Sequence, residues 1–318
     1  MLTYEEFKNT FCVQYPEVMG SEFDGYEMKL MPVVKRGRTL DGFTFCRKLD
    51  EKRVTAMPTF YFNELYESYC DNQDMAVCIE QTAESMKSAL IKGDAISCNV
   101  KISKIKKNVI AELVNPEIAS PYLYNVPHRE FLNLYIIYRW VVNVDESGVY
   151  SGIIDNDLMN SVELTEDELY ENALKNTRRI IIPQIKPFDT VVRKLLRRDG
   201  RSEYEIRKFI GKIEPDERMW ILTNKHHFRG STTLLFSDFL DKVAQKVGDD
   251  FYIIPTSVNE SMAVSVRSSL TPDKMLEMLC DSNNAYFNDD DQMLSETIYY
   301  YSVKDKTLSV FDVGEVRV

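Results

Sequence analysis

The stretch FLNLYIIYRWVVNV at residues 131–144, followed by DESG at 145–148 and VYSGII at 149–154, decides the fold class of this chain. The first part is rich in β-branched and aromatic residues, which favour strands. Asp, Ser and Gly in the DESG segment are typical of a turn, so the third part is expected to return as an antiparallel partner. The centre of the chain is therefore predicted to be a β-hairpin.

The sequence before this hairpin mixes helix and strand signals. Thr3 and Glu6 have capping-box spacing and open an amphipathic helix, and residues 26–35 and 40–48 predict two paired strands. A basic segment at 101–114, KISKIKKNVIAELV, is predicted to be a helix that Pro116 ends, because the proline ring and its missing N–H cannot continue a helix. We expect an α+β arrangement here.

The sequence after the hairpin continues the alternation. Thr165 and Glu168 form a second capping box, and further helices are expected from Ser237 to Gly248 and from Thr271 onward. Six strands are predicted, at MWILT (219–223), STTLLF (231–236), FYIIP (251–255), MAVSV (262–266), TIYYYSV (297–303) and LSVFDV (308–313). Strands that alternate with single helices suggest a sheet with helices on one face.

Together these signals predict an α+β fold with mixed, antiparallel-rich sheets and helices packed on one face. A chain of 318 residues exceeds the usual size of one small core, so two or three subdomains are expected. We place them at 1–92 (α+β), 93–213 (helical segment, long hairpin and basic helix) and 214–318 (α/β).

Composition and the first residues indicate the compartment. The opening MLTYEEFKNTF is acidic where a signal peptide is basic, and no stretch near eighteen apolar residues occurs. We therefore expect a cytoplasmic protein without a membrane span. The six cysteines form no CxxC pair, and the acidic run at 288–291 lacks the spacing and glycine of a calcium loop. Free thiols, no metal and no cofactor are expected.

Standard catalytic signatures are absent: the sequence contains no GxxxxGK[ST], GxGxxG, HExxH or GxSxG. Active sites also assemble from distant residues, so an enzyme stays an alternative. Abundant tyrosine suits contact surfaces. The leading hypothesis is a non-enzymatic binding or regulatory protein with an unknown protein partner.

The loop TNKHHFRGSTT at 223–233 contains the best candidates for a small-ligand site. In an enzyme or small-ligand protein acting on an anionic metabolite, glycine would let backbone N–H groups approach the anion, arginine would bind it bidentately, and histidine would move a proton. The candidate ligand-binding residues are Asn224, His227, Arg229, Gly230 and Ser231. The alternative is an ordinary hairpin loop whose glycine occupies a strained backbone position.

Residues 193–212 reverse the local charge: eight basic residues minus three acids gives +5, in a chain of net charge −11. An acidic partner or a nucleic acid could bind here, and nearby aromatic residues could stack. The chain's negative charge opposes general nucleic-acid binding, and a solvated linker helix is the other alternative. The candidate basic patch comprises Arg193, Arg197, Arg198, Arg201, Arg207 and Lys208.

Five blocks occur in a familiar order and spacing: TLDGFTF, PTFYFNELYESY, VPHREFLNLYIIYRWVV, MWILTNKHHFRGSTTLL and DDFYIIPTSVNE. In them the chain resembles the bacterial domain-of-unknown-function family 5688 over almost its whole length. The resemblance implies a cytoplasmic bacterial protein and brings no established activity and no catalytic residue. Two features depart from the family pattern: the basic stretch is longer and more charged, and STT replaces small alanine-like residues after Gly230.

Overall fold

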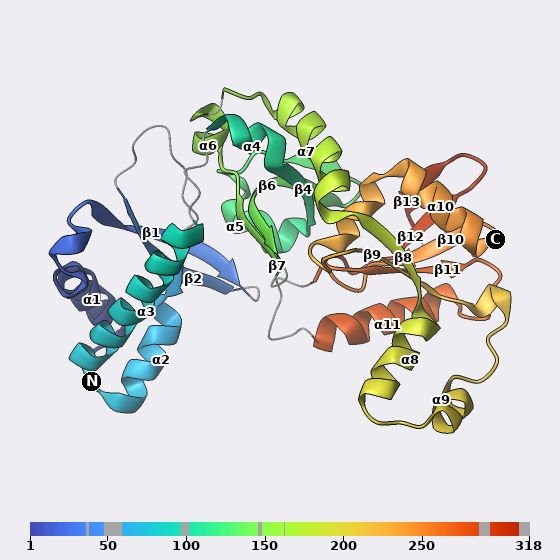
Figure 1. The fold of residues 1–318 in the computed structure, drawn as a ribbon, viewed down its shortest axis with the longest axis horizontal. Coiled ribbons are helices and arrows are strands. Elements are labelled where there is room, and N and C mark those ends of the chain that lie inside the picture. Colours follow the sequence, from blue (N-terminus) through green and yellow to red (C-terminus); the bar gives the residue numbers. More distant parts are fainter. Residues whose placement is uncertain are drawn as a thin grey trace. The chain divides into compact units, whose positions relative to one another are not determined.

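The computed structural model (Figure 1) describes residues 1–35, 38–47, 59–96, 102–145, 148–161, 163–285 and 293–311. These residues form two compact units. The first comprises Met1–Val109, Ser120–Pro127 and Arg139–Leu169, and the second Ile110–Ala119, His128–Tyr138 and Tyr170–Val318. The predicted α+β class with antiparallel-rich sheets is confirmed. Division of the chain into 1–92, 93–213 and 214–318 stays a prediction.

Helix α1 (Tyr4–Met19) begins at the predicted capping box. The Thr3 hydroxyl accepts a hydrogen bond from the Glu6 N–H, and the Glu6 carboxylate accepts one from the Thr3 N–H at 2.9 Å. This pair satisfies donors that the first helical turn leaves free. Four side chains at i, i+4 spacing then lie on one face and are fully buried: Phe7, Phe11, Tyr15 and Met19.

The core of the first unit is aromatic and lies between three helices and one face of a small antiparallel sheet. Phe43 lies at its centre, with its ring centroid 5.4 Å from that of Phe11 and 4.8 Å from that of Phe62. The predicted strands pair antiparallel, and the helices follow, as Figure 1 shows. The elements are β1 (Tyr26–Lys35), β2 (Arg38–Arg47), β3 (Phe60–Tyr61), α2 (Phe62–Asn72) and α3 (Met75–Ile96), with a short 3-10 helix, η1 (Ser21–Phe23).

The central hairpin is confirmed. Strand β6 (Leu134–Asp145) pairs antiparallel with β7 (Gly148–Ile153), and Trp140 lies opposite Gly152. Strand β5 (Arg129–Phe131) also pairs antiparallel with β6 in this sheet. Helix α6 (Asn156–Ser161) follows, and then α7 (Glu166–Ile181). The second capping box, at Thr165 and Glu168, is confirmed by the same reciprocal bonds as in α1.

The prediction of one helix over 101–114 is wrong. Helix α4 ends at Asn108 after beginning at Ile102, and 109–114 form strand β4 (Val109–Val114), a neighbour of β6. All six residues of β4 are buried, so both of its faces require apolar side chains, and such a strand shows no alternation in sequence. Pro116 opens helix α5 (Pro116–Leu123), where its missing N–H costs no hydrogen bond.

The second unit is built on a six-stranded antiparallel sheet. One face, with Ile254 and Val264, packs on Met275 and Leu279 of helix α11 (Pro272–Ala285), and Figure 1 shows helix α10 (Ser237–Val247) on the other side. Helices thus cover both faces here, whereas α1–α3 cover one face of the first sheet. In order across the sheet, the strands are β13 (Thr307–Val310), β12 (Tyr299–Ser302), β10 (Phe251–Ile254), β11 (Ser261–Ser265), β9 (Trp220–Asn224) and β8 (Pro183–Pro187).

The predicted strand STTLLF is also wrong, because 230–235 form a 3-10 helix, η3 (Gly230–Leu235). The Thr233 hydroxyl donates to the Gly230 carbonyl at 2.8 Å. This local hydrogen bond competes with the backbone hydrogen bonds that a strand would make to a neighbouring strand. The predicted stop of the following helix is confirmed, since Gly248 has φ +87°, a left-handed value that favours glycine.

The environment of Tyr300 in β12 leads us to expect that the protein loses stability at high pH. A hydrogen bond to Asp250, with burial, raises the pKa of Tyr300 to about 12, whereas unfolded phenols titrate near 10. Between these values the unfolded chain releases the proton and the folded chain keeps it, so stability falls as pH rises from about 10 to about 12. The difference in 295 nm absorbance between wild type and Tyr300→Phe, followed against pH, should have its midpoint near 12. A midpoint near 10 would contradict this environment.

Candidate functional site

The loop after β9 is organised by the side chain of Asn224. This side chain is fully buried; its Oδ1 accepts hydrogen bonds from the N–H groups of His226 (2.9 Å) and Phe228 (3.3 Å), and its Nδ2 donates to the Phe228 carbonyl at 2.6 Å. An asparagine that bonds backbone two and four residues later closes a tight loop. The Asn224 amide is therefore engaged in shaping the loop.

Asn259, in the turn before β11, holds the loop from the other side. Its Oδ1 accepts from the Arg229 N–H at 2.9 Å, and its carbonyl accepts from the Thr223 hydroxyl at 2.8 Å. Gly230 passes directly over this carbonyl: a Cβ at Gly230 would lie 2.1 Å from the Asn259 O. The sequence suggested a strained glycine, but the left-handed residues are His227 (φ +50°) and Arg229 (φ +49°). Gly230 is needed for close approach.

Ser231 lies beneath the loop and is fully buried. Its hydroxyl donates to the Ser257 carbonyl at 2.7 Å and lies 2.7 Å from the Ser261 hydroxyl oxygen. These contacts join η3 to β11 and to the turn before it. Buried hydroxyl groups require such partners, so the contacts explain how a serine can occupy this position without a bound ligand.

Arg229 forms an ion pair with a buried glutamate that the sequence did not single out. Its Nε lies 2.9 Å from Oε1 of Glu112, whose side chain is 3% exposed, compared with 21% for Arg229. Glu112 is the one charged residue in the apolar run VIAELV of β4, and that isolation is the signal that could have identified it. Because the carboxylate compensates the guanidinium charge, Arg229 is not an uncompensated cation.

His227 points to a different neighbour, Lys186 of β8. The His227 Nε2 lies 3.0 Å from the Lys186 Nζ, and His227 is exposed. In this contact the Lys186 ammonium is the donor and the ring nitrogen the acceptor. Burial, followed by repulsion from Lys194, lowers the pKa of Lys186. The loop thus brings four of the candidates together, Asn224, Arg229, Gly230 and Ser231, whereas His227 contacts a different neighbour. A ligand-binding role for these five residues stays a prediction.

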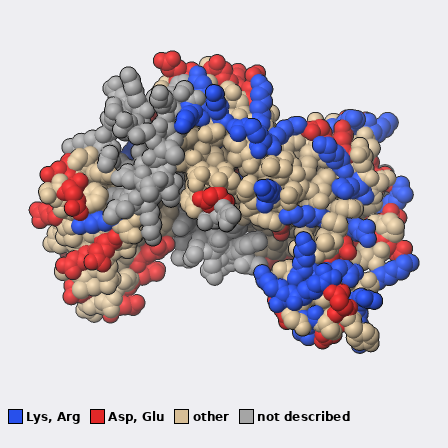
Figure 2. All heavy atoms as spheres, in the orientation of Figure 1, with Lys and Arg blue, Asp and Glu red and all other residues tan. Residues whose placement is uncertain are grey.

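The basic stretch folds into two short helices, α8 (Phe188–Arg198) and α9 (Glu203–Ile210), which contact each other. We call residues 188–212 the α8–α9 hairpin. Figure 2 shows Lys and Arg side chains gathered over this part of the molecule. Acids neutralise several of the cations at close range: Arg193 with Asp189, Arg197 with Glu203, Arg201 with Glu205, and Lys212 with Glu214.

Four cations of the α8–α9 hairpin lie outside ion-pair distance of any acid in the described part of the chain: Lys194, Arg198, Arg207 and Lys208. Two aromatic side chains of α9 are also exposed, Tyr204 at 76% and Phe209 at 75%. Only Ile206 is fully buried in α9. The two rings therefore contribute little to the packing of the hairpin itself.

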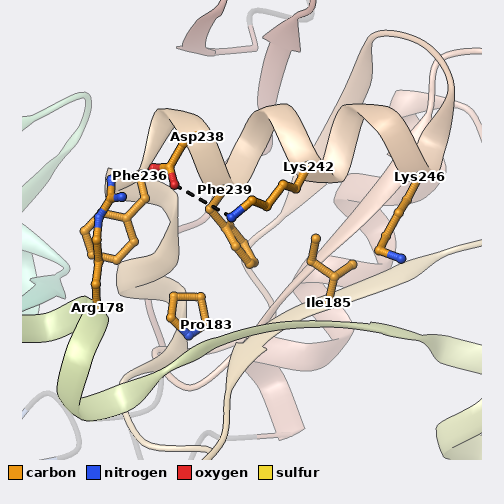
Figure 3. A pocket seen from close by; sticks show the side chains of 8 residues that line it. All are labelled: Arg178, Pro183, Ile185, Phe236, Asp238, Phe239, Lys242 and Lys246. Carbon is orange, nitrogen blue, oxygen red and sulfur yellow. Dashed lines mark ion pairs between the residues drawn. The ribbon is translucent and has the colours of Figure 1, made fainter.

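A groove between β8 and α10 brings together residues that the sequence did not connect (Figure 3). Its volume is about 350 Å³. Apolar side chains form its floor: Pro183, Ile185, Phe236 and Phe239. Charged side chains form its rim: Arg178, Asp238, Lys242 and Lys246. The i, i+4 spacing of Lys242 and Lys246 was the only local signal, and it is common on exposed helices.

Two expectations concern metals and membranes. Within the described ranges, no group of three or more His, Cys, Asp or Glu side chains is arranged to hold a metal ion, and Cys12, Cys70, Cys78 and Cys280 are free thiols. The acidic run at 288–291 lies outside those ranges. Among the helices of the described residues, none is both long and apolar enough to cross a membrane.

Comparison with known proteins identifies the family. No curated protein and no solved structure matches the chain. One family model does match, over residues 4–303, and its description is "Family of unknown function (DUF5688)". Since this match spans nearly all of the sequence, including both compact units, the chain belongs to the DUF5688 family of unknown function.

Proposed function

We propose that this protein is a non-enzymatic, cytoplasmic binding protein that recognises an acidic protein partner through the α8–α9 hairpin. The observation that carries the proposal is the exposure of Tyr204 and Phe209 in the same hairpin as four cations that pair with no acid among the described residues. Aromatic and arginine side chains contribute most of the energy at protein interfaces. Lysine and arginine around them attract an acidic surface and speed its association.

Charge distribution favours a protein over a nucleic acid as the partner. Glu203 and Glu205 are each about half exposed, at 52% and 51% of their side chains, and lie in the same hairpin as the cations. A phosphate backbone carries a regular row of negative charges and would meet these carboxylates, whereas a protein can place its acids only opposite the free cations. The chain's net charge of −11 adds to the repulsion of a polyanion.

The contact can be tested in the native host with a photo-crosslinking amino acid. Phe209 is replaced by p-benzoylphenylalanine, in the wild-type background and together with Arg198→Glu and Lys208→Glu. We expect a discrete protein adduct that the double charge reversal reduces at least about tenfold, the effect of removing a central contact. Lys274→Glu, a single charge reversal at an exposed position of α11, is the control and should leave the adduct unchanged.

Direct binding distinguishes the classes of partner. Fluorescence anisotropy with a labelled glutamate–tyrosine copolymer should show binding that the double reversal weakens, and Tyr204→Ser with Phe209→Ser should weaken it as well. These side chains are exposed, so the melting temperature should hardly change. A nuclease-sensitive adduct, or tighter binding to the oligonucleotide dT20 at physiological salt, would favour a nucleic acid instead. An adduct insensitive to Arg198→Glu and Lys208→Glu would exclude the hairpin as the binding surface.

A further inference from the structure

The floor of the β8–α10 groove is apolar and partly open. Phe236 and Phe239 are almost fully buried, at 2% and 6% exposure, and turn one side toward the groove. Pro183 and Ile185 of β8 lie opposite them and are half-buried (Figure 3). A concavity of about 350 Å³ with aromatic and aliphatic walls has the size and lining of a small-molecule site.

The rim of the groove carries an excess of positive charge. Arg178 is ion-paired with Asp238, and its guanidinium carbon lies 4.4 Å from the centre of the Phe236 ring. Lys242 Nζ is 3.9 Å from the same carboxylate, and Lys246 Nζ lies 5.3 Å from the centre of the Trp220 ring. Three cations and one acid leave a local charge of about +2 in a chain of −11, which attracts an anion to this place.

The open edge of β8 excludes a peptide strand as the occupant. Phe188 N–H donates to the Met219 carbonyl at 3.0 Å, so even-numbered residues here direct their backbone groups to β9. The odd-numbered residues of β8 direct theirs to the open edge; they are Pro183, Ile185 and Pro187. Since proline has no N–H, only Ile185 within β8 can donate there, and a regular ladder cannot form.

We infer that the β8–α10 groove binds a small ligand that combines a flat apolar ring with one anionic group, a carboxylate or a phosphate. The ring packs against Phe239 and Ile185, and the anion is held by Lys242 and Lys246. In Figure 3, Lys246 extends from α10 toward β8, whereas Lys242 runs along α10 toward the Asp238 carboxylate. The side chain of Lys242 is 65% exposed, so it can turn toward a ligand without disturbing the fold. This site is separate from the α8–α9 hairpin and does not depend on its role.

Calorimetric titration with four probes tests the inference: 2-naphthoate, 2-naphthyl phosphate, 2-naphthalenemethanol and acetate. At least one of the aromatic anions should bind with a Kd of about 1 mM or tighter, on the order expected for ligands of this size. The neutral alcohol and acetate should each bind at least about tenfold more weakly, because each lacks one half of the recognised chemistry. Whichever of the two aromatic anions binds more tightly identifies the preferred anionic group, carboxylate or phosphate.

Variants place the binding in the groove. The double variant Lys242→Gln with Lys246→Gln should weaken binding of the aromatic anion at least about tenfold. Ile185→Glu, which adds a carboxylate to the floor of the groove, should abolish this binding. Lys274→Gln is the control for the loss of one lysine charge on another helix, and circular dichroism checks that each variant is folded. Equal binding of the neutral alcohol, the absence of saturable binding by both anions, or affinity unchanged in the double variant would each overturn the inference.

Discussion

Gly230→Ala is expected to destabilise the second unit by about 3 kcal/mol, near the upper end of the usual cost of overpacking. Its Cβ would lie 2.1 Å from the Asn259 carbonyl oxygen and 2.6 Å from the Thr223 hydroxyl oxygen. Neither neighbour can move easily, because the Thr223 hydroxyl already donates to that same carbonyl. The clash must therefore displace backbone, and it would loosen the loop that carries Arg229.

Chemical denaturation followed by circular dichroism measures this loss of stability. Gly25→Ala is the matched control, since no atom lies within 4 Å of its added Cβ and its φ is not left-handed; it should change stability by less than about 0.5 kcal/mol. If Gly230→Ala were as mild as the control, the close packing of the loop on Asn259 would be incorrect. The glycine would then be free for the ligand role that the sequence suggested.

Arg229→Met is expected to cost about 3 kcal/mol, because it removes the guanidinium that pairs with the buried carboxylate of Glu112. Methionine keeps much of the side-chain length and has the same difficulty as arginine with φ +49°, so the change isolates the charge. Arg229→Lys keeps the positive charge and should lose less. Urea unfolding of the purified variants gives the comparison.

The double variant separates the ion pair from the packing of each side chain. Glu112→Gln removes the buried charge, so Arg229→Met with Glu112→Gln should be less unstable than the sum of the single changes, by about 2 kcal/mol. Additive losses would mean that the two charges do not interact. A loss below about 1 kcal/mol for Arg229→Met would return Arg229 to the list of groups available for an anionic ligand.

The two proposed surfaces differ in how they would be recognised. The α8–α9 hairpin carries exposed rings, so it suits a macromolecule that covers it. The β8–α10 groove is concave and has an apolar floor, so it suits a small molecule. Because the charge changes at Arg198 and Lys208 do not touch Lys242 or Lys246, each proposal can fail without affecting the other.

The candidate loop shows how far sequence reasoning reached. It identified Asn224, Arg229, Gly230 and Ser231 as candidates, and the structure buries all of them except Arg229, which is partly exposed. It did not reveal the residues that contact them from distant parts of the sequence, such as Asn259. A side chain's partner across the fold leaves no trace in local spacing, so ligand contacts and structural contacts look the same in one sequence.

Local signals were enough for the features that adjacent residues determine by themselves. The capping boxes at Thr3 and Thr165, the hairpin around residue 145 and the helix stop at Gly248 follow from bonds and backbone preferences within a few positions, so the sequence alone predicted them.

Tertiary structure alone decided what depends on burial and on distant partners. The segment VIAELV is a strand because both of its faces are covered, and a fully buried strand has the same apolar pattern as a buried helix. The run after Gly230 is a 3-10 helix because its hydroxyl groups bond beneath the loop. The β8–α10 groove exists because the fold brings Ile185 opposite Phe239, two elements that no periodicity in the sequence connects.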